Sequence, residues 1–122
     1  MDKILMKHPK NWGLDFARVE NISNKVLKKF NFDFKVELSI FFVGRKRAKD
    51  LNIKYRRMDY VPQVLGFPNS KEKDPDGWVR LGDVVICTDK LKEETRLVSN
   101  KKRSMYKILE EWIEHGVENL LK

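Results

Sequence analysis

Few side chains of this sequence could do chemistry, and the most suggestive of them lie near its C-terminal end. There are two histidines, His8 and His115, and one cysteine, Cys87. Glu111, His115 and Asn119 are spaced four residues apart, which would place them in one row on a helix. A hydrolytic zinc site normally takes three good protein ligands, and a neutral amide is a weak zinc donor. These residues alone therefore predict a poor metal site, and the ordinary alternative is a histidine that hydrogen-bonds to its neighbours.

A dense basic segment is the second candidate for function. Residues 45–57 hold one acidic residue, Asp50, against the cations Arg45, Lys46, Arg47, Lys49, Lys54, Arg56 and Arg57. Arginine can fork onto phosphate oxygens and stack on bases, and Tyr55 adds an aromatic ring beside Arg56. Because these charges cannot all point one way on a helix, we expect a broad collar that binds RNA through Arg45, Lys46, Arg47, Lys49 and Arg57. The alternative is an exposed helix whose charges serve only solubility.

The whole chain is basic. Its 122 residues include 26 Lys and Arg against 18 Asp and Glu, and the formal net charge is +8. A domain this basic suits polyanions, because each neutralised phosphate releases condensed counterions. A merely solvated basic surface is the competing interpretation. The length fits one domain over residues 1–122, and the 41% apolar fraction can supply a core.

Cysteine content and hydropathy bear on the compartment. A single cysteine excludes an internal disulfide, and the apolar neighbours of Cys87 indicate a buried structural thiol. The longest apolar run, residues 38–43, is far shorter than a membrane span. The N-terminus has no charged-then-apolar signal segment. We therefore expect a cytoplasmic protein that does not enter a membrane.

Periodicity predicts the elements that would position these residues. We expect helices over 14–30, 45–55 and 105–121, a half-buried strand over 35–43, an edge or entry strand over 61–67 and a central strand over 78–87. A further helix, capped by Thr88 or Asp89, would turn Leu91, Leu97 and Val98 inward. Residues 1–12 should form a short extended or irregular lead-in. The order indicates an α+β fold, with a small mixed β-sheet of three to four strands packed with about four helices.

Three ordered blocks resemble the YbeY family of rRNA-maturation endoribonucleases. The first block comprises Leu51-Asn52, Tyr55-Arg56, Asp59, Val64-Leu65 and Phe67-Pro68, and it is similar to the family pattern LN-x-x-YR-x-x-D followed by TDVLSFP. The second block, Leu81 to Cys87, resembles the family's LGDIVIS strand. The third, His115-Gly116, corresponds to the start of HGxxHLxGYDH. The resemblance covers the chain from about residue 35 to its end.

This resemblance implies a YbeY-like fold and a specific chemistry. In the family, a late helix and the loop after it present three histidines to zinc, and an arginine faces the metal across a positively charged cleft. The implied activity is metal-dependent hydrolysis of phosphodiester bonds in single-stranded RNA during small-subunit rRNA maturation. By this resemblance Arg56 and His115 are the catalytic candidates, and His115 is also the first metal ligand. The implied partners are ribosomal RNA, the small ribosomal subunit and other ribosome-assembly proteins.

The sequence departs from the family at the metal site. Asn119 occupies the second ligand position, and the third has no counterpart before Lys122. Pro62-Gln63 and Gly66 also replace family residues. We therefore expect zinc to bind weakly or not at all. The chain is then an endoribonuclease that draws a ligand from elsewhere, or a metal-free RNA- or ribosome-binding factor that uses the same cleft. A third alternative is a basic domain that docks on a protein through Trp12 and Trp78, although both are expected in the core.

Overall fold

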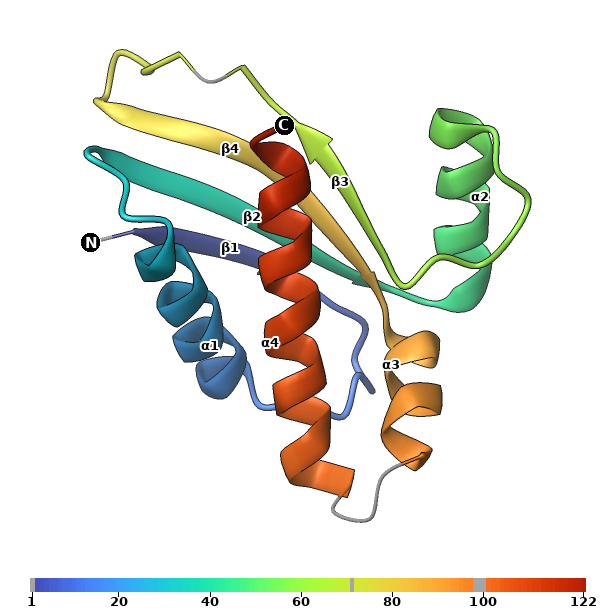
Figure 1. The fold of residues 1–122 in the computed structure, drawn as a ribbon. Coiled ribbons are helices and arrows are strands. Elements are labelled where there is room, and N and C mark those ends of the chain that lie inside the picture. Colours follow the sequence, from blue (N-terminus) through green and yellow to red (C-terminus); the bar gives the residue numbers. More distant parts are fainter. Residues whose placement is uncertain (1, 71, 98–100) are drawn as a thin grey trace.

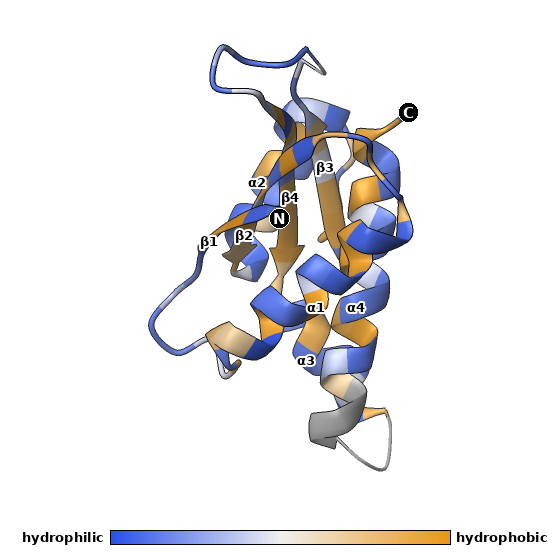
Figure 2. Cartoon of the chain, turned by 90° about the vertical axis from the view of Figure 1, so that its left-hand side faces the viewer, coloured by the Kyte–Doolittle hydropathy of each residue, from blue (hydrophilic) through white to orange (hydrophobic). Residues whose placement is uncertain are grey.

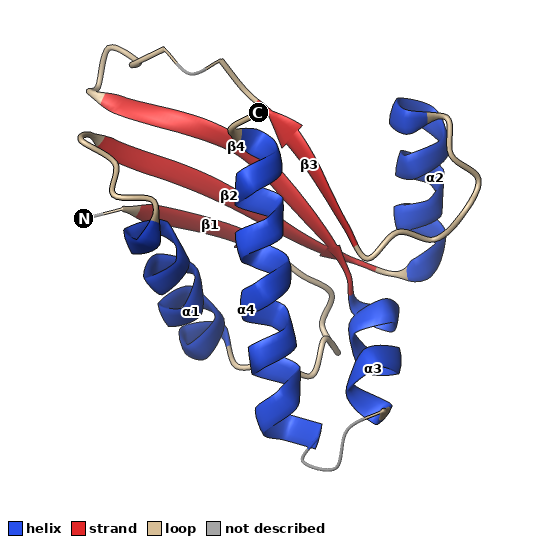
Figure 3. Ribbon diagram, in the orientation of Figure 1, coloured by secondary structure: helices blue, strands red, loops and turns tan. Residues whose placement is uncertain are grey.

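The computed structural model of the chain describes residues 2–70, 72–97 and 101–122, which form a four-stranded sheet flanked by helices (Figure 1). Along the chain these residues form β1 (Lys3–Lys7), α1 (Phe16–Lys29), β2 (Lys35–Val43), α2 (Arg45–Arg56), β3 (Val64–Pro68), β4 (Trp78–Cys87), α3 (Thr88–Arg96) and α4 (Lys101–Leu120). Figure 3 shows the same elements by type. The predicted α+β fold with a small mixed sheet is confirmed.

The strands lie in the order β1-β2-β4-β3. β2 pairs in parallel with β1 and with β4, and β3 pairs antiparallel with β4. β4 is therefore central and β3 is an edge strand, as predicted. The first strand was not predicted, because residues 1–12 were expected to be a lead-in without a strand. β1 has only five residues with a lysine at each end, and Ile4 alone among them is buried, so no alternation marks it.

One face of the sheet carries the core. Because strand side chains alternate between faces, Leu38, Ile40 and Phe42 of β2 point to the same side, and all three are buried. They pack in one cluster with apolar residues of α1 and α4, and the apolar colour concentrates on the strands and recurs along these helices (Figure 2). Each side chain buried in this way stabilises the fold by about 1.5–3 kcal/mol.

The ends of the helices correct several predictions. α1 begins after its N-cap Asp15, whose carboxylate accepts hydrogen bonds from the backbone N–H groups of Ala17 and Arg18 at 2.9 and 3.3 Å. The predicted helix from residue 14 therefore started too early. The helix over 105–121 was predicted too late, because α4 already begins at Lys101. Leu97 was predicted to point inward, but it follows the last residue of α3 and is 80% exposed. Val98 lies outside the described residues.

Asp89 caps a different helix from the one predicted. α3 has its N-cap at Cys87, with no hydrogen bond from a capping side chain. The Oδ2 atom of Asp89 instead accepts from the backbone N–H of Arg45, the first residue of α2, at 2.8 Å. The hydroxyl of Thr88 donates to the carbonyl oxygen of Val43 at 3.2 Å. Both side chains therefore fasten the junction between β2 and α2.

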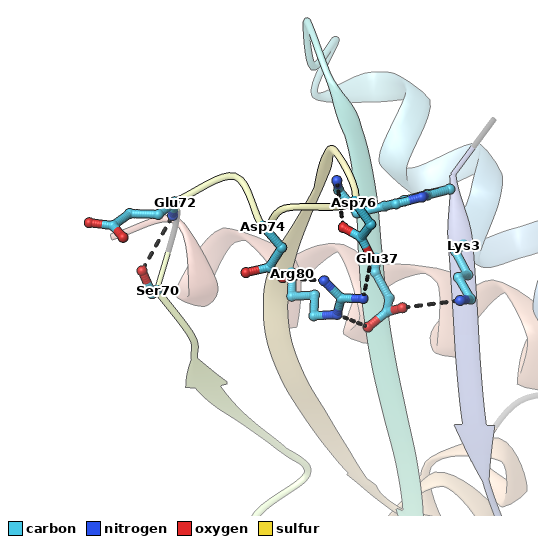
Figure 4. Close-up of polar contacts among 8 residues, drawn as sticks. Lys3, Glu37, Ser70, Glu72, Asp74, Asp76 and Arg80 are labelled. Carbon is cyan, nitrogen blue, oxygen red and sulfur yellow. Dashed lines mark hydrogen bonds and ion pairs between the residues drawn. The ribbon is translucent and has the colours of Figure 1, made fainter.

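A polar network fixes the loop between β3 and β4 on the other face of the sheet (Figure 4). Arg80 of β4 forms ion pairs with Glu37 of β2 at 3.0 Å and with Asp76 at 2.9 Å, and it also pairs with Asp74. Lys3 of β1 adds a pair with Glu37 at 3.5 Å. Arg80 thereby joins β4 to β2 and to the loop, and Glu37 extends the network to β1.

Several single-residue predictions can be compared with the structure. Cys87 is buried, as expected, and burial raises the pKa of its thiol. Trp12 is a core residue that stacks on the His8 ring, with the ring centroids 3.7 Å apart. Trp78 is half-buried, and the ammonium groups of Lys3 and Lys35 lie 5.9 and 5.6 Å from the centroid of its ring. Of the helices in the described residues, none has the length and apolar content needed to cross a membrane.

Candidate functional site

The candidate site is a groove of about 780 Å³, which we call the β3–α4 cleft. Its walls come from the loop after α2, from β3, from the first turn of α3 and from the last turns of α4, which pass beside β3 (Figure 1). The lining residues are Arg56, Tyr60, Val61, Pro62, Gln63, Val64, Leu65, Gly66, Lys90, His115, Asn119 and Lys122. Arg56 and His115, which the sequence singled out, thus line the same groove.

Two glycines bring α4 close enough to form this groove. Gly116 is buried against β4, and a Cβ atom added there would lie 2.7 Å from Cγ1 of Val84. Gly66 of β3 faces α4, and its added Cβ would lie 3.2 Å from Cβ of Asn119. Side chains at either position would push the helix away from the sheet. His115 and Asn119, which flank this contact on α4, therefore line the groove beside β3.

The opposite wall depends on Asn52, which is fully buried in α2. Its Nδ2 group donates to the backbone carbonyl oxygen of Tyr60 at 3.0 Å, and its backbone carbonyl oxygen accepts from the backbone N–H of Met58 at 3.3 Å. Between them Arg57 ends the helix in a left-handed conformation, with φ of 56°. The chain consequently folds back so that Arg56 and Tyr60 both line the cleft.

The cleft is cationic. Arg56, Lys90, His115 and Lys122 line it, and no acidic side chain of the described residues does so. Among these side chains, only Lys90 has an acidic partner in the described part of the chain: its ammonium group lies 3.9 Å from a carboxylate oxygen of Glu93. Such an exposed pair contributes little, about 0–1 kcal/mol. The groove therefore favours an anionic ligand.

The predicted basic collar lies mostly elsewhere. Of Arg45, Lys46, Arg47, Lys49 and Arg57, all of which the structure describes, none lines the cleft. Arg45 pairs with Glu93 at 3.2 Å, and Lys49 pairs with Asp59 at 3.4 Å. Arg47 lines a different hollow, on the other face of the sheet. The RNA-binding roles of these five residues stay predictions.

Sequence reasoning did not single out Lys90, Lys122 and Tyr60 as cleft residues. The position of Lys90 follows from the topology, because the antiparallel pairing of Val64 with Ile86 sets the start of β3 beside the end of β4. The first turn of α3, which follows β4 directly, then lies next to β3. Had the antiparallel pairing of β3 with β4 been predicted, Lys90 could have been assigned to the site from the sequence.

The family model for Endoribonuclease YbeY matches residues 10–121 of the chain. The chain belongs to the YbeY family. Two of the three blocks that carry the resemblance contribute to the cleft: the first supplies Arg56 and residues 64–65 of β3, and the third supplies His115 of α4.

Individual relatives match part of their length. The Endoribonuclease YbeY of Thermodesulfovibrio yellowstonii is 31% identical over 84 residues, which covers 69% of this chain and 50% of the relative. That of Aquifex aeolicus is 35% identical over 86 residues, covering 70% and 54%. The chain thus spans about half the length of these relatives. The solution structure of TM1509 from Thermotoga maritima superposes with a TM-score of 0.60 at 25% identity, over 100% of this chain and 73% of that one.

The zinc site implied by the YbeY resemblance does not fit the residues present. His115 and Asn119 line the cleft, but Glu111 lines a separate groove on the α1 side of α4. The described residues contain no group of three or more His, Cys, Asp or Glu side chains that could hold a metal. Three cations, Arg56, Lys90 and Lys122, line the same groove and would oppose a divalent ion. The donor set therefore suits an anion better than zinc.

Proposed function

We propose that the β3–α4 cleft binds the sugar–phosphate backbone of single-stranded ribosomal RNA, and that the protein acts in rRNA maturation on the small ribosomal subunit in the cytoplasm. The observation that supports this most is the union of Arg56, Lys90, His115 and Lys122 in one groove without an acidic lining residue. Membership of the YbeY family supports RNA as the polyanion.

Each lining group has a distinct task in this proposal. The Arg56 guanidinium can hold a phosphate through two parallel hydrogen bonds, whereas Lys90 and Lys122 act as point charges. The Tyr60 ring is 48% exposed and can stack on a base, which is how single strands bind without sequence preference. The groove thus contacts phosphates and one base face together.

Endoribonuclease action is a second candidate, supported by the family and by the shared position of Arg56 and His115. In that reaction Arg56 would stabilise the charge that develops on the scissile phosphate. His115 would transfer a proton to or from a ribose oxygen, the role that histidine takes most often in general acid–base catalysis. Arg56 and His115 contact the RNA under both candidate functions, so RNA binding and RNA cleavage must be measured separately.

A salt titration tests the binding proposal. We expect log K for a single-stranded fragment of small-subunit rRNA to fall steeply with log salt, by about 0.7 per phosphate contacted. Arg56→Ala should lower the affinity and reduce the slope by about one such contact. Lys10→Ala, which removes an exposed charge outside both the cleft and the basic segment over 45–57, is the matched control. A flat salt response, or equal losses in both variants, would contradict binding in the cleft.

A cleavage assay decides the second candidate. The same fragment is incubated with purified protein in a chelator and with added zinc, magnesium or manganese. If the protein is an endoribonuclease, cleavage should be lost in both Arg56→Ala and His115→Ala. Absence of cleavage under all of these conditions, with RNA binding intact, would leave binding as the function of the cleft.

A further inference from the structure

A second hollow, of about 360 Å³, lies beneath α2 on the opposite face of the sheet from the core. Phe41 of β2 and Val85 of β4 point to this face, because their neighbours Ile40 and Val84 belong to the core. Arg47, Leu51 and Tyr55, spaced four apart on α2, form the facing wall. We call this site the α2 hollow. Its volume lies at the lower end of the range for small-molecule pockets.

The acidic group of the α2 hollow is Asp83 of β4, which is half-buried. Burial raises the pKa of this carboxyl, and no cation or donor of the described residues offsets the cost. Because Asp83 is only partly buried, its carboxylate oxygens remain open to a ligand that enters the hollow. A ligand with N–H donors would restore the missing hydrogen bonds.

Arg47 lines the same hollow as Asp83, yet within the described part of the chain these two side chains do not form an ion pair. The hollow therefore offers five N–H donors on one side and two acceptor oxygens on another. A ligand that fits both must present acceptors and donors on different edges.

Aromatic rings complete the hollow. Tyr55 is 57% exposed and packs edge-on against Phe67, with ring centroids 5.2 Å apart and planes at 71°. Phe41 of β2 is half-buried and lines the hollow from the sheet. Flat heteroaromatic ligands stack on such rings, as unstacked RNA bases do on aromatic side chains.

We propose that the α2 hollow binds a guanine base of single-stranded RNA. Guanine carries two donors, N1–H and the N2 amino group, on its Watson–Crick edge, which match the two oxygens of Asp83. It carries two acceptors, O6 and N7, which form the commonest specific contact of arginine and match Arg47. The ring itself would lie against Tyr55.

Other occupants fit less well. Adenine, cytosine and uracil each present one donor group on the corresponding edge, so one oxygen of Asp83 would stay unpaired. An arginine or lysine of a protein partner could donate to Asp83, but its charge would lie beside the Arg47 guanidinium and be repelled. A neutral base avoids that repulsion. The α2 hollow is separate from the β3–α4 cleft, and its occupation does not require the cleft to bind RNA.

Amide chemical shifts of the ¹⁵N-labelled protein locate the site. Guanosine, adenosine, cytidine and uridine are titrated in parallel, as nucleosides, so that no phosphate is present to bind in the cationic cleft. Guanosine should shift amides of β2, β4 and α2 around the hollow, and the other three should have weaker effects. Equal responses to all four nucleosides, or none from guanosine, would overturn the proposal.

Oligonucleotides and variants then test the contacts. A uridine decamer with one central guanosine should bind at least about fivefold more tightly than the all-uridine decamer, the lower limit for one bidentate base contact. Asp83→Asn and Arg47→Met should each abolish this preference, whereas Lys10→Met, which removes an exposed charge outside the hollow, should keep it. Retention of the preference in both hollow variants would overturn the inference.

The same assay separates this inference from the cleft proposal. Arg56→Ala should weaken both decamers by the same factor and leave their ratio unchanged. If Arg56→Ala leaves the affinity for the all-uridine decamer unchanged, the cleft proposal fails. If the guanosine-containing decamer binds no more tightly than the all-uridine decamer, the guanine proposal fails.

Discussion

The β3–α4 cleft and the α2 hollow both border β3 but are built in different ways. The cleft is formed by α4, a helix of 20 residues that packs on both β3 and β4. The hollow is formed by α2, where only Ala48 and Asn52 are buried. The cleft lining has cations without acidic groups, whereas the hollow has one cation and one carboxylate. Uniform charge favours any phosphate backbone, while mixed polarity can distinguish between bases. Four substitutions can break or sharpen this comparison.

The largest effect should come from filling the contact between α4 and the sheet. In Gly116→Val the new side chain meets Val84, and we expect the free energy of unfolding to fall by about 3 kcal/mol, the upper range for overpacking. Urea unfolding measures this loss. Glu118→Val, which places the same side chain on an exposed position of α4, should change stability by no more than about 0.5 kcal/mol. Equal stability of the two variants would show that the close packing of α4 on β4 at Gly116 does not contribute to the stability of the fold.

Removing Asn52 should affect both regions, because this α2 residue also holds the loop of the cleft. Asn52→Ala leaves the carbonyl oxygen of Tyr60 without its donor, and we expect a loss of about 2 kcal/mol in stability. RNA affinity should also fall as Tyr60 loses its position. Lys54→Ala, an exposed position of α2, is the control for both measurements. If Asn52→Ala loses stability but keeps its RNA affinity, the position of the loop after α2 does not contribute to RNA binding in the cleft.

Removing the cap of α2 should affect the hollow more than the cleft. Asp89→Ala deletes the acceptor for the backbone N–H of Arg45, which should destabilise the first turn of α2 by about 1 kcal/mol. Hydrogen exchange of that turn should become faster, and the preference for guanosine should decrease without loss of all-uridine binding. Asp89→Asn retains an acceptor oxygen and should behave nearly as the wild type. Unchanged exchange in Asp89→Ala would show that the cap does not hold α2.

The smallest effect concerns the polar network on the open face of the sheet. The hydrogen bond and charge of Arg80 lower the pKa of Asp76 below its ordinary value of 3.8. Because the pKa is lowered in the folded state, the contribution to stability is present above the unfolded value and is lost as the pH falls through the folded one. Wild type should therefore be slightly more stable than Arg80→Met at neutral pH, and the difference should shrink as the pH falls below the ordinary carboxyl pKa of 3.8. Arg96→Met on the exposed end of α3 is the control, and a difference that persists in acid would contradict the role of Asp76.

Most of the fold could be predicted from local patterns, and the exceptions have physical reasons. β2 was predicted with its observed bounds because polar and apolar residues alternate before a fully apolar end. β1 was not predicted because its five residues show no alternation of polar and apolar side chains. It forms a strand through its pairing with β2, which lies more than thirty residues later in the chain. Asp89 was assigned to the nearest helix, but its carboxylate reaches α2, forty-four residues earlier in the chain.

The site was predictable only in part. The resemblance brought Arg56 and His115 into consideration together, and the structure has both on one groove. Nothing local marks Lys90 or Lys122, since single lysines are common on any surface. The family blocks contain Tyr55, Phe67 and Asp83, but nothing local shows that these residues line one hollow. They come together only when α2, β3 and β4 pack. What these residues bind is a question for the experiments above.

The order of the strands also bears on how copies of the chain meet one another. The two outer strands expose backbone groups that could in principle recruit a strand from a neighbour. β1 has a lysine at each end, and β3 is short and finishes at Pro68, which has no N–H to donate. Charge repulsion at one margin and a missing donor at the other disfavour sheet extension, so concentrated solutions of this protein should resist fibril growth.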